Sequence, residues 1–339
     1  MKRKNKIKRI LLIKPSSLGD IIHGLPVLKA FRYKWPDAKI SWVIKDVYGD
    51  ILNGNPLIDD LILLNKNSLT TSILSFRKKL RQGRFDLTVD MQGLFRSGFV
   101  AFLSGAPVRV GFSNAREMAP LFYTYKVDAP LNLHAVDRNL KLAASLGCEN
   151  QEIDFPLNLS EEVQQKVSRY LQKNQLDTKH PLITFVPGAR WEKKRWPALL
   201  FSRLGNLLNQ ELSAGIIVAG SREEKGLIHE IRSAMKIPSS EATDFSLQKL
   251  TALLIKSDVV VTNDSGPMHI AAAKGTPVVA LFGPTDPQRT GPYTKKCIII
   301  HKEMECAPCF RKHCNQNSFE CMESITVEEV FEGVQRMLR

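Results

Sequence analysis

The chain has 339 residues, of which 43% are hydrophobic and 24% are charged. This composition excludes a disordered or fibrous chain, and the length predicts two globular domains, since one domain usually takes about 100 to 200 residues. The formal net charge of +14 at pH 7 indicates a polyanionic partner: a nucleic acid, an anionic membrane surface or a phosphorylated substrate.

The N-terminal segment MKRKNKIKR is basic, like the first part of a signal peptide. The apolar run behind it, residues 10–13, is interrupted by Lys14 and Pro15, so we expect no secretion. No apolar run reaches the roughly 18 residues that a membrane-spanning helix needs. The six cysteines do not resemble a secreted disulfide framework, which favours a reducing compartment. We therefore expect a cytoplasmic protein.

Short apolar runs alternate with longer amphipathic stretches, which is typical of a parallel α/β fold. In the first half of the chain the runs are residues 10–13, 40–44, 61–64 and 87–89. The rhythm weakens over residues 112–160 and starts again with runs at 183–187, 215–220, 258–263 and 277–283. Two α/β domains follow. We place their boundary where FPLNLS leads into an acidic helix start, which gives domains 1–158 and 159–339.

Ligands of open parallel sheets bind beyond the carboxyl ends of the strands, so the turns after these runs are candidate sites. The first turn ends in Gly19 and Asp20, before a helix that we expect from about residue 21. Asp20 is either a helix N-cap, which its residue type alone favours, or a carboxylate that accepts a proton from an attacking hydroxyl. Gly19 permits close approach of a substrate. No G-x-G-x-x-G follows the strand, which argues against a dehydrogenase.

The first turn of the second domain is strongly basic. The segment FVPGARWEKKRWP, residues 185–197, carries four cations: Arg190, Lys193, Lys194 and Arg195. Cations beside a helix N-terminus suit a diphosphate, because backbone N–H groups and the helix dipole add to the charge. The alternative is a solvated charged loop, although two interleaved tryptophans are costly to expose.

A polar turn, Asn263-Asp264-Ser265-Gly266, separates a buried strand from a helix of small residues. Asp264, Ser265 and the Gly266 backbone can form hydrogen bonds with a sugar or a ribose. His269, one turn into the helix, is either a packed core histidine or a ligand-binding residue. Its neighbours favour the second interpretation.

Three runs carry a resemblance to a known family: SSLGDIIH near the start, KRWP midway and NDSGPMHIAAA late in the chain. Over nearly its whole length the chain resembles glycosyltransferase family 9, the ADP-heptose:lipopolysaccharide heptosyltransferases. The resemblance implies a GT-B fold with two Rossmann-like domains facing across a cleft. The N-terminal domain then binds the acceptor and the C-terminal domain binds the nucleotide sugar. It also implies inverting transfer without a metal ion, and no Asp-x-Asp motif occurs in the chain.

The resemblance assigns roles to individual residues. Asp20 matches the catalytic base, and Lys194 matches the lysine that contacts the donor diphosphate. Glu223 matches a ribose-binding glutamate, with Glu224 as the alternative because the spacing differs by one. The other donor-site matches are Gly188, Arg190, Phe245 on the adenine side, Asp264, Ser265, Gly266 and His269. The acceptor-site candidates are Ser17, Gly19, Arg116 and Arg138, whose guanidinium groups suit the carboxylates or phosphates of a Kdo-bearing lipid.

Two branches of the family share features with this chain. Residues 90–97, 114–117 and 134–139 resemble the acceptor domain of heptosyltransferase I, which is the nearer match. The PGA start of the basic turn, followed by Arg190, is more similar to heptosyltransferase II. The resemblance implies transfer of heptose from ADP-L-glycero-D-manno-heptose to the Kdo-bearing inner core of lipopolysaccharide. The basic N-terminus and the net charge then fit a peripheral enzyme on the cytoplasmic face of the inner membrane.

Other functions stay open at this point. A family 9 transferase with another nucleotide sugar or another core acceptor is the first alternative. A non-catalytic nucleotide-sugar-binding protein is disfavoured because it would not need Asp20. A nucleic-acid-binding protein is disfavoured because the basic residues are dispersed and no recognised binding motif appears.

Four cysteines lie within sixteen residues near the C-terminus: Cys306, Cys309, Cys314 and Cys321. The first two form Cys-x-x-Cys, the usual first half of a structural zinc site, and His313 lies among them. The second pair is spaced more widely than in ordinary zinc knuckles, so free thiols or a redox-labile pair are the alternative. We assign the cluster no catalytic role and expect catalysis to need no cofactor.

Overall fold

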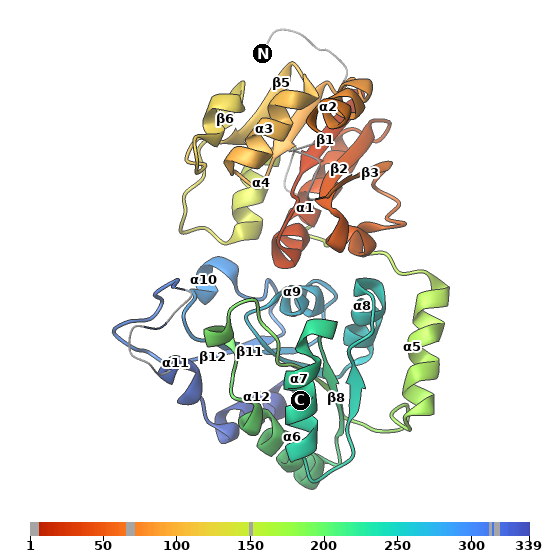
Figure 1. Cartoon of the computed structure of the whole chain (residues 1–339), viewed down its shortest axis with the longest axis vertical. Coiled ribbons are helices and arrows are strands. Elements are labelled where there is room, and N and C mark those ends of the chain that lie inside the picture. The colour runs from red at the N-terminus through yellow and green to blue at the C-terminus, as the bar shows by residue number, and fades with distance from the viewer. Residues whose placement is uncertain (1–6, 66–71, 149–151, 312–313, 315–318) are drawn as a thin grey trace. The chain divides into compact units, whose positions relative to one another are not determined.

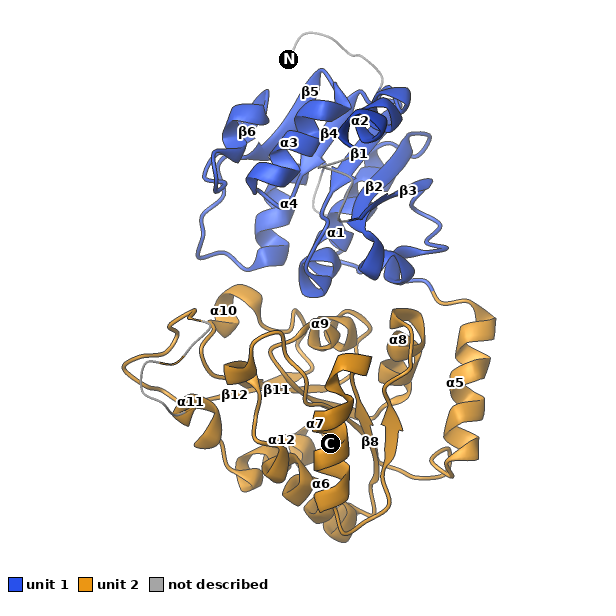
Figure 2. Ribbon diagram, viewed as in Figure 1, with its two compact units in different colours: residues 1–158 blue, residues 159–339 orange. Residues whose placement is uncertain are grey.

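The computed structural model describes residues 7–65, 72–148, 152–311, 314 and 319–339. The chain divides into two compact units, residues 1–158 and 159–339, which Figure 2 colours separately. Within the described residues each unit has one six-stranded parallel sheet flanked by helices (Figure 1). The α/β class predicted from the alternating apolar runs is therefore confirmed.

The sheet of the N-terminal unit has the strand order β3-β2-β1-β4-β5-β6. Its strands are β1 (Arg9–Ile13), β2 (Lys39–Lys45), β3 (Asp60–Leu64), β4 (Leu87–Asp90), β5 (Val108–Phe112) and β6 (Tyr125–Val127). The order reverses between β1 and β4, and ligands of such sheets bind beside this switch point. Ile13 and Asp90 are register partners, so the turns after β1 and β4 start side by side.

Helices cover both faces of this sheet. Helix α1 (Leu18–Lys34) packs against α4 (Ala135–Ser145), whereas α2 (Ile73–Gln82) packs against α3 (Phe95–Ser104) on the opposite face (Figure 1). Alternate residues of a strand point to opposite faces, so Leu11 and Ile13 join the core beneath α2 and α3. Two short 3-10 helices, η1 (Asp46–Leu52) and η2 (Ala119–Phe122), complete the described elements of this unit.

The sheet of the C-terminal unit has the strand order β12-β11-β10-β7-β8-β9. Its strands are β7 (Leu182–Val186), β8 (Gly215–Ala219), β9 (Ser240–Ala242), β10 (Val259–Asn263), β11 (Val278–Phe282) and β12 (Cys297–His301). β10 lies between β7 and β11, so the turns after these three strands open at one edge of the sheet.

The helices of the C-terminal unit form two groups. One core cluster joins the sheet to α6 (Ala198–Leu212), α7 (Lys225–Ala234) and α12 (Val327–Leu338). A second group is α5 (Glu161–Lys173), α8 (Leu247–Lys256) and α9 (Gly266–Ala273), in which α8 contacts both of the others. Shorter elements are η3 (Glu192–Lys194), η4 (Arg222–Glu224), α10 (Pro287–Thr290) and α11 (Glu320–Glu323).

Eight strands coincide with the predicted apolar runs, and four do not. The four that the sequence pattern missed are β5, β6, β9 and β12, which lie at or next to the sheet edges. β6 is short, is partly exposed and has Lys126 in its middle, so it lacks a continuous apolar run. β12 does carry such a run in residues 297–300, which the prediction did not use. Among the described helices none has the length and the apolar character needed to cross a bilayer.

Candidate functional site

The turn between β1 and α1 holds the proposed base. Helix α1 begins at Leu18 with Ser17 as its N-cap, and Asp20 is its third residue. The prediction of a helix start near residue 21, with Asp20 at the cap, is therefore wrong by three residues. The reason is a reciprocal capping box, in which Asp20 takes the place that glutamate or glutamine usually fills. The peptide bond between Ser16 and Ser17 is cis.

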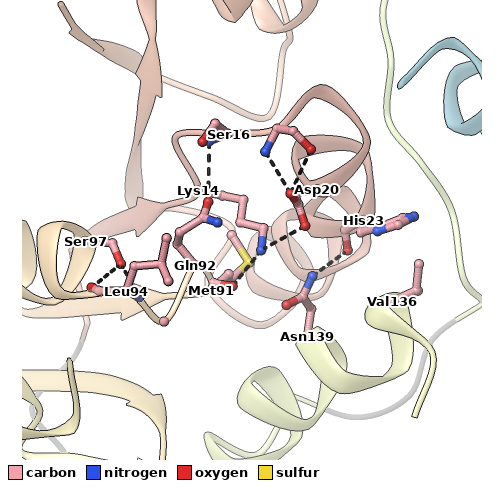
Figure 3. A network of polar contacts seen from close by, with 12 residues as sticks. Lys14, Ser16, Asp20, His23, Met91, Gln92, Leu94, Ser97, Val136 and Asn139 are labelled. Atoms are coloured by element: carbon pink, nitrogen blue, oxygen red, sulfur yellow. Dashed lines mark hydrogen bonds and ion pairs between the residues drawn. The ribbon is translucent and has the colours of Figure 1, made fainter. Parts of the chain in front are cut away.

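Asp20 is held from two sides (Figure 3). The backbone N and the Oγ of Ser17 both donate to Asp20 Oδ2 at 2.8 Å. On the other side the Lys14 Nζ lies 3.7 Å from Asp20 Oδ1. The Asp20 side chain stays 39% exposed despite these contacts, so its capping role leaves it accessible.

Lys14 is a buried cation that the sequence analysis treated only as the end of an apolar run. It is 6% exposed, and its Nζ donates to the carbonyl oxygen of Met91 at 2.7 Å (Figure 3). A buried ammonium needs such partners. Met91 follows β4, so the pairing of β1 with β4 brings it to Lys14 across a sequence separation of 77 residues.

The turn after β4 is organised by Asp90, which is fully buried. The hydroxyl of Tyr123 donates to Asp90 Oδ2 at 2.7 Å, and the backbone N atoms of Gln92 and Gly93 donate to Oδ1 at 2.8 and 3.2 Å. Burial raises the pKa of Asp90 above its ordinary value, although these hydrogen bonds favour its ionised form. Gln92 Oε1 accepts a hydrogen bond from the Ser16 backbone N at 3.4 Å. The loop before α1 therefore rests on this turn.

The two acceptor-site arginines differ in their surroundings. Arg116 is exposed, and its backbone N donates to the carbonyl oxygen of Gly93 at 3.0 Å, beside the turn after β4. Arg138 packs within the unit, where its Nη2 donates to Asn114 Oδ1 at 2.7 Å. Its guanidinium carbon lies 4.0 Å from the centre of the Phe112 ring. The structure therefore brings Arg116 to the edge that carries the base candidate and gives Arg138 a packing role.

In the C-terminal unit an ion pair joins two of the predicted donor-site residues. Lys194 Nζ lies 2.5 Å from Asp264 Oδ2, and the two side chains are only 15% and 8% exposed. The Thr285 hydroxyl donates to the same carboxylate oxygen at 2.6 Å. The Lys194 ammonium also lies 4.9 Å from the centre of the Trp191 ring. An ammonium has three N–H donors, so this pair leaves Lys194 the capacity to contact an anionic ligand.

Asn263 connects the basic turn to the polar turn. It ends β10 and is fully buried. Its Oδ1 accepts from the Trp196 backbone N at 3.1 Å, and its Nδ2 donates to the Pro187 carbonyl oxygen at 2.7 Å. Ser265 caps α9, so Gly266 is the first residue of that helix, and His269 is buried within it at 6% exposure. The structure thus brings the two turns together through a residue to which the sequence analysis gave no separate role.

Glu224, rather than Glu223, lies against the basic turn. A Cβ atom added to Gly188 would lie 1.9 Å from Glu224 Oε1, so the turn lies directly against this carboxylate, which would have to move if residue 188 had a side chain. The Ser221 backbone N donates to Glu224 Oε2 at 2.8 Å. Glu223 is exposed, and hydrogen bonds within this turn lower its pKa. Of the two glutamates considered from the sequence, these contacts favour Glu224.

Two further donor-site candidates lie in more open surroundings. Phe245 follows β9, the strand next to β8, and packs edge-to-face against Tyr170 with ring centres 5.0 Å apart. Arg190 is exposed in the basic turn.

Cys309, one of the four C-terminal cysteines, lies beside the basic turn. Lys193 is 2% exposed, and its Nζ donates to the Cys309 sulfur at 3.2 Å. The described residues contain no group of three or more histidine, cysteine, aspartate or glutamate side chains that could hold a metal ion. His313 lies outside the described residues. The structure therefore gives no support to the zinc site predicted from the spacing.

Comparison with known proteins identifies the family of this chain. Residues 73–319 match the family described as glycosyltransferase family 9 (heptosyltransferase). The chain belongs to glycosyltransferase family 9. It is therefore a glycosyltransferase, as the motifs had predicted.

The family 9 relatives match this chain over most of its length. Lipopolysaccharide heptosyltransferase 1 of Pseudomonas aeruginosa is 29% identical over 328 residues, which cover 92% of this chain and 89% of the relative. Lipopolysaccharide heptosyltransferase 2 of Escherichia coli is 28% identical over 305 residues, which cover 86% of this chain and 87% of the relative.

Solved structures of family 9 proteins share the fold. A family 9 glycosyltransferase from Veillonella parvula is 26% identical to this chain and has a TM-score of 0.85. The match covers 98% of this chain and 97% of the Veillonella chain. The E. coli ADP-heptose lipopolysaccharide heptosyltransferase II is 24% identical, with a TM-score of 0.81 and coverage of 97% and 98%. The GT-B fold class that the resemblance implied is thereby confirmed.

Proposed function

We propose that this family 9 glycosyltransferase transfers heptose from ADP-L-glycero-D-manno-heptose to the Kdo-bearing inner core of lipopolysaccharide. The curated relatives named above are lipopolysaccharide heptosyltransferases of both the first and the second type. The observation that carries the proposal is a partly exposed carboxylate, Asp20, held at the switch point of the sheet in the N-terminal unit.

Asp20 acts as the general base. Its Oδ2 accepts two Ser17 hydrogen bonds, which hold the carboxylate in place, while the side chain stays 39% exposed to a substrate. Asp20 removes the proton of the acceptor hydroxyl as the hydroxyl oxygen attacks the anomeric carbon of the donor. A glycosidic bond forms, the bond from the anomeric carbon to the diphosphate breaks, and ADP leaves. The configuration of the anomeric carbon inverts because attack and departure occur on opposite sides.

The C-terminal unit binds the donor. Lys194 contacts the diphosphate and stabilises the charge that develops on the leaving ADP. Helix α9 begins at Gly266, after its N-cap residue Ser265. The backbone N–H groups at this helix start carry a partial positive charge near the Lys194–Asp264 ion pair, and they add to the attraction for the diphosphate. Glu224 accepts hydrogen bonds from the ribose hydroxyls, and Phe245 packs beside the adenine.

The same residues carry the reaction without a metal ion or a catalytic cofactor. The cationic groups of the basic turn supply the charge that a divalent cation would otherwise bring to the diphosphate. We expect transfer to persist in a chelator. Loss of activity in the chelator, restored by magnesium, would refute this part of the proposal.

The acceptor is a Kdo-lipid A type glycolipid, bound by the N-terminal unit through Arg116 at the edge that carries Asp20. We place the enzyme in the cytoplasm, peripheral on the inner membrane, because its acceptor is anchored there. The alternative is the reaction of heptosyltransferase II, in which the acceptor already carries one heptose. The exposed Arg190 and the PGA start of the basic turn favour this alternative.

Two measurements test the proposal. The first is thermal stabilisation of the purified protein by ADP, GDP and UDP, and we expect ADP to give the largest shift. The second is turnover of ADP-heptose on a Kdo-lipid acceptor and on a heptosylated acceptor, with wild type and Asp20→Asn. Loss of turnover with retained ADP binding in Asp20→Asn supports the base. A preference for GDP or UDP overturns the donor assignment.

A further inference from the structure

An aromatic surface covers one side of α3 and the adjoining η2. Neighbouring phenylalanine rings on it have centres 5.3 to 6.5 Å apart, in stacked, tilted and edge-to-face pairs. Phe95 and Phe102 are 48% and 49% exposed, and Leu121 is 69% exposed. The aromatic surface consists of Phe95, Phe99, Phe102 and Phe122, and the adjoining segment 118–122 adds the exposed side chains of Met118 and Leu121.

Most of this surface lies outside the apolar face that α3 needs for folding. Val100, Ala101 and Leu103 bury one side of the helix in the core of the unit, and Phe99 packs partly against the same core. Phe95 and Phe102 contact Phe99 and Phe122 at helical spacing and stay 48% and 49% exposed. A second, contiguous apolar face that remains exposed marks an interaction site.

The neighbouring helix α2 supplies a strong positive charge. Residues 77–84 contain five basic residues and no acidic one: Arg77, Lys78, Lys79, Arg81 and Arg84. All five are exposed, and α2 packs beside α3 on the same face of the sheet (Figure 1). In the part of the chain that the structure describes, no carboxylate lies within 4.0 Å of Arg77, Lys78 or Lys79.

We propose that the α2–α3 face docks on an anionic lipid bilayer. The aromatic surface enters the boundary between head groups and acyl chains, and the cations of α2 contact the lipid phosphates. Exposed aromatic and leucine side chains beside unpaired lysine and arginine are the composition of interfacial membrane-binding elements. The partner must therefore offer both negative charge and an apolar interior, as an anionic bilayer does. A neutral bilayer would leave the cations of α2 unpaired.

The position of the face in the fold suits a lipid-anchored acceptor, and this step rests on the proposed function. Phe95 begins α3 three residues after Gln92, which contacts the loop that carries Asp20. The aromatic surface therefore starts at the sheet edge that holds the base and runs away from it along α3. A glycolipid whose acyl chains stay in the bilayer can then present its sugar at that edge.

Flotation of the full chain with lipid vesicles tests the docking face. We expect binding to vesicles of phosphatidylcholine mixed with phosphatidylglycerol, and little binding to phosphatidylcholine alone. Phe102→Ser combined with Leu121→Ser should weaken the partition coefficient by about tenfold or more. The triple substitution Arg77→Glu, Lys78→Glu and Lys79→Glu should weaken it at least as much, since each cation contributes about fivefold at an anionic surface.

Matched controls come from the C-terminal unit. Leu199→Ser changes a leucine that is 52% exposed, and the triple substitution Lys173→Glu, Lys236→Glu and Lys256→Glu makes the same charge change elsewhere. Both controls should bind vesicles like the wild type, apart from the weak effect of net charge. Thermal unfolding of each variant shows whether the fold is intact.

Equal binding to neutral and anionic vesicles overturns the proposal, as does wild-type binding by folded variants of the α2–α3 face. So does a wild type that self-associates through this face and does not float. Turnover on an acceptor without acyl chains separates this inference from the proposed function. Variants of the α2–α3 face should keep their turnover on the acceptor without acyl chains. If the proposed function is wrong, every protein, the wild type included, lacks this turnover, whereas the binding to vesicles is unchanged.

Discussion

Lys194 and Asp264 form an ion pair across 2.5 Å in which both side chains are largely buried. Removing one partner of such a pair leaves the other charge buried without compensation, which costs about 3 to 5 kcal/mol. The pair therefore has a structural role in addition to the proposed contact of Lys194 with the donor diphosphate. The two roles can be separated experimentally.

Lys194→Met should lower both the stability of the protein and its affinity for ADP, the latter by about tenfold or more, because a charged hydrogen-bond donor is lost. Lys194→Met combined with Asp264→Asn should recover much of the stability but not the ADP affinity. Titration calorimetry with ADP and thermal unfolding measure the two effects. Lys256→Met, at an exposed lysine of the same unit, is the control. Unchanged ADP affinity in Lys194→Met would rule out the diphosphate contact.

Lys14 is expected to hold Asp20 in position, because its Nζ lies 3.7 Å from Asp20 Oδ1 and is fixed by the Met91 carbonyl oxygen. Lys14→Met removes this charged partner and should lower kcat/KM by about tenfold or more. Lys29→Met, at a half-exposed lysine of α1 that pairs with Asp154, should leave kcat/KM unchanged. Thermal unfolding shows whether each variant is folded, and an unchanged kcat/KM in folded Lys14→Met would exclude the positioning role.

Glu224 and Glu223 provide a matched pair of adjacent carboxylates. Glu224→Gln should weaken ADP binding by about tenfold, since Glu224 lies against Gly188 in the basic turn and is the proposed ribose ligand. Glu223→Gln, at an exposed residue, should have little effect. Comparison of adenosine with adenine in the same titration tests the contact, because the two ligands differ only by the ribose. If Glu223→Gln is the more damaging change, the assignment reverses.

Tyr123 stabilises a buried carboxylate, and its removal should have a pH-dependent cost. Burial raises the pKa of Asp90 in the folded state above 3.8, its ordinary value. The contribution of Asp90 to stability is therefore fully present below pH 3.8 and is lost as the pH rises through the folded-state pKa. Tyr123→Phe removes a donor to the ionised form and should destabilise the protein by about 1.5 to 3 kcal/mol at pH 7, and by less near pH 4. Urea unfolding at both pH values measures this.

Tyr125→Phe, at a more exposed tyrosine two residues away, controls for the loss of a hydroxyl. An equal effect of Tyr123→Phe at both pH values would show that Asp90 has the same charge throughout this range.

The central strands and the positions of the turns were predictable because both are local properties of the chain. A strand buried on both faces must be apolar along its whole length, as in β1 and β10, and the polar residues that follow it then stand out. Asp20 and Asp264 were found in this way. The exposed edge strand β6, with Lys126 in its middle, carries no such signal and was missed.

The sequence by itself thus determined the alternation of strands and helices, the family motifs and the turns in which we propose the chemistry to lie. Only the tertiary structure decided the partners of those turns. Strand register brings Met91 to Lys14, and therefore a buried lysine to Asp20, across a separation that local spacing does not encode. The same holds for Gly188 and Glu224, whose close approach depends on β7 and β8 being neighbours in the sheet. The physical reason is that strand pairing joins distant segments, whereas a sequence pattern records only what each segment needs for its own burial.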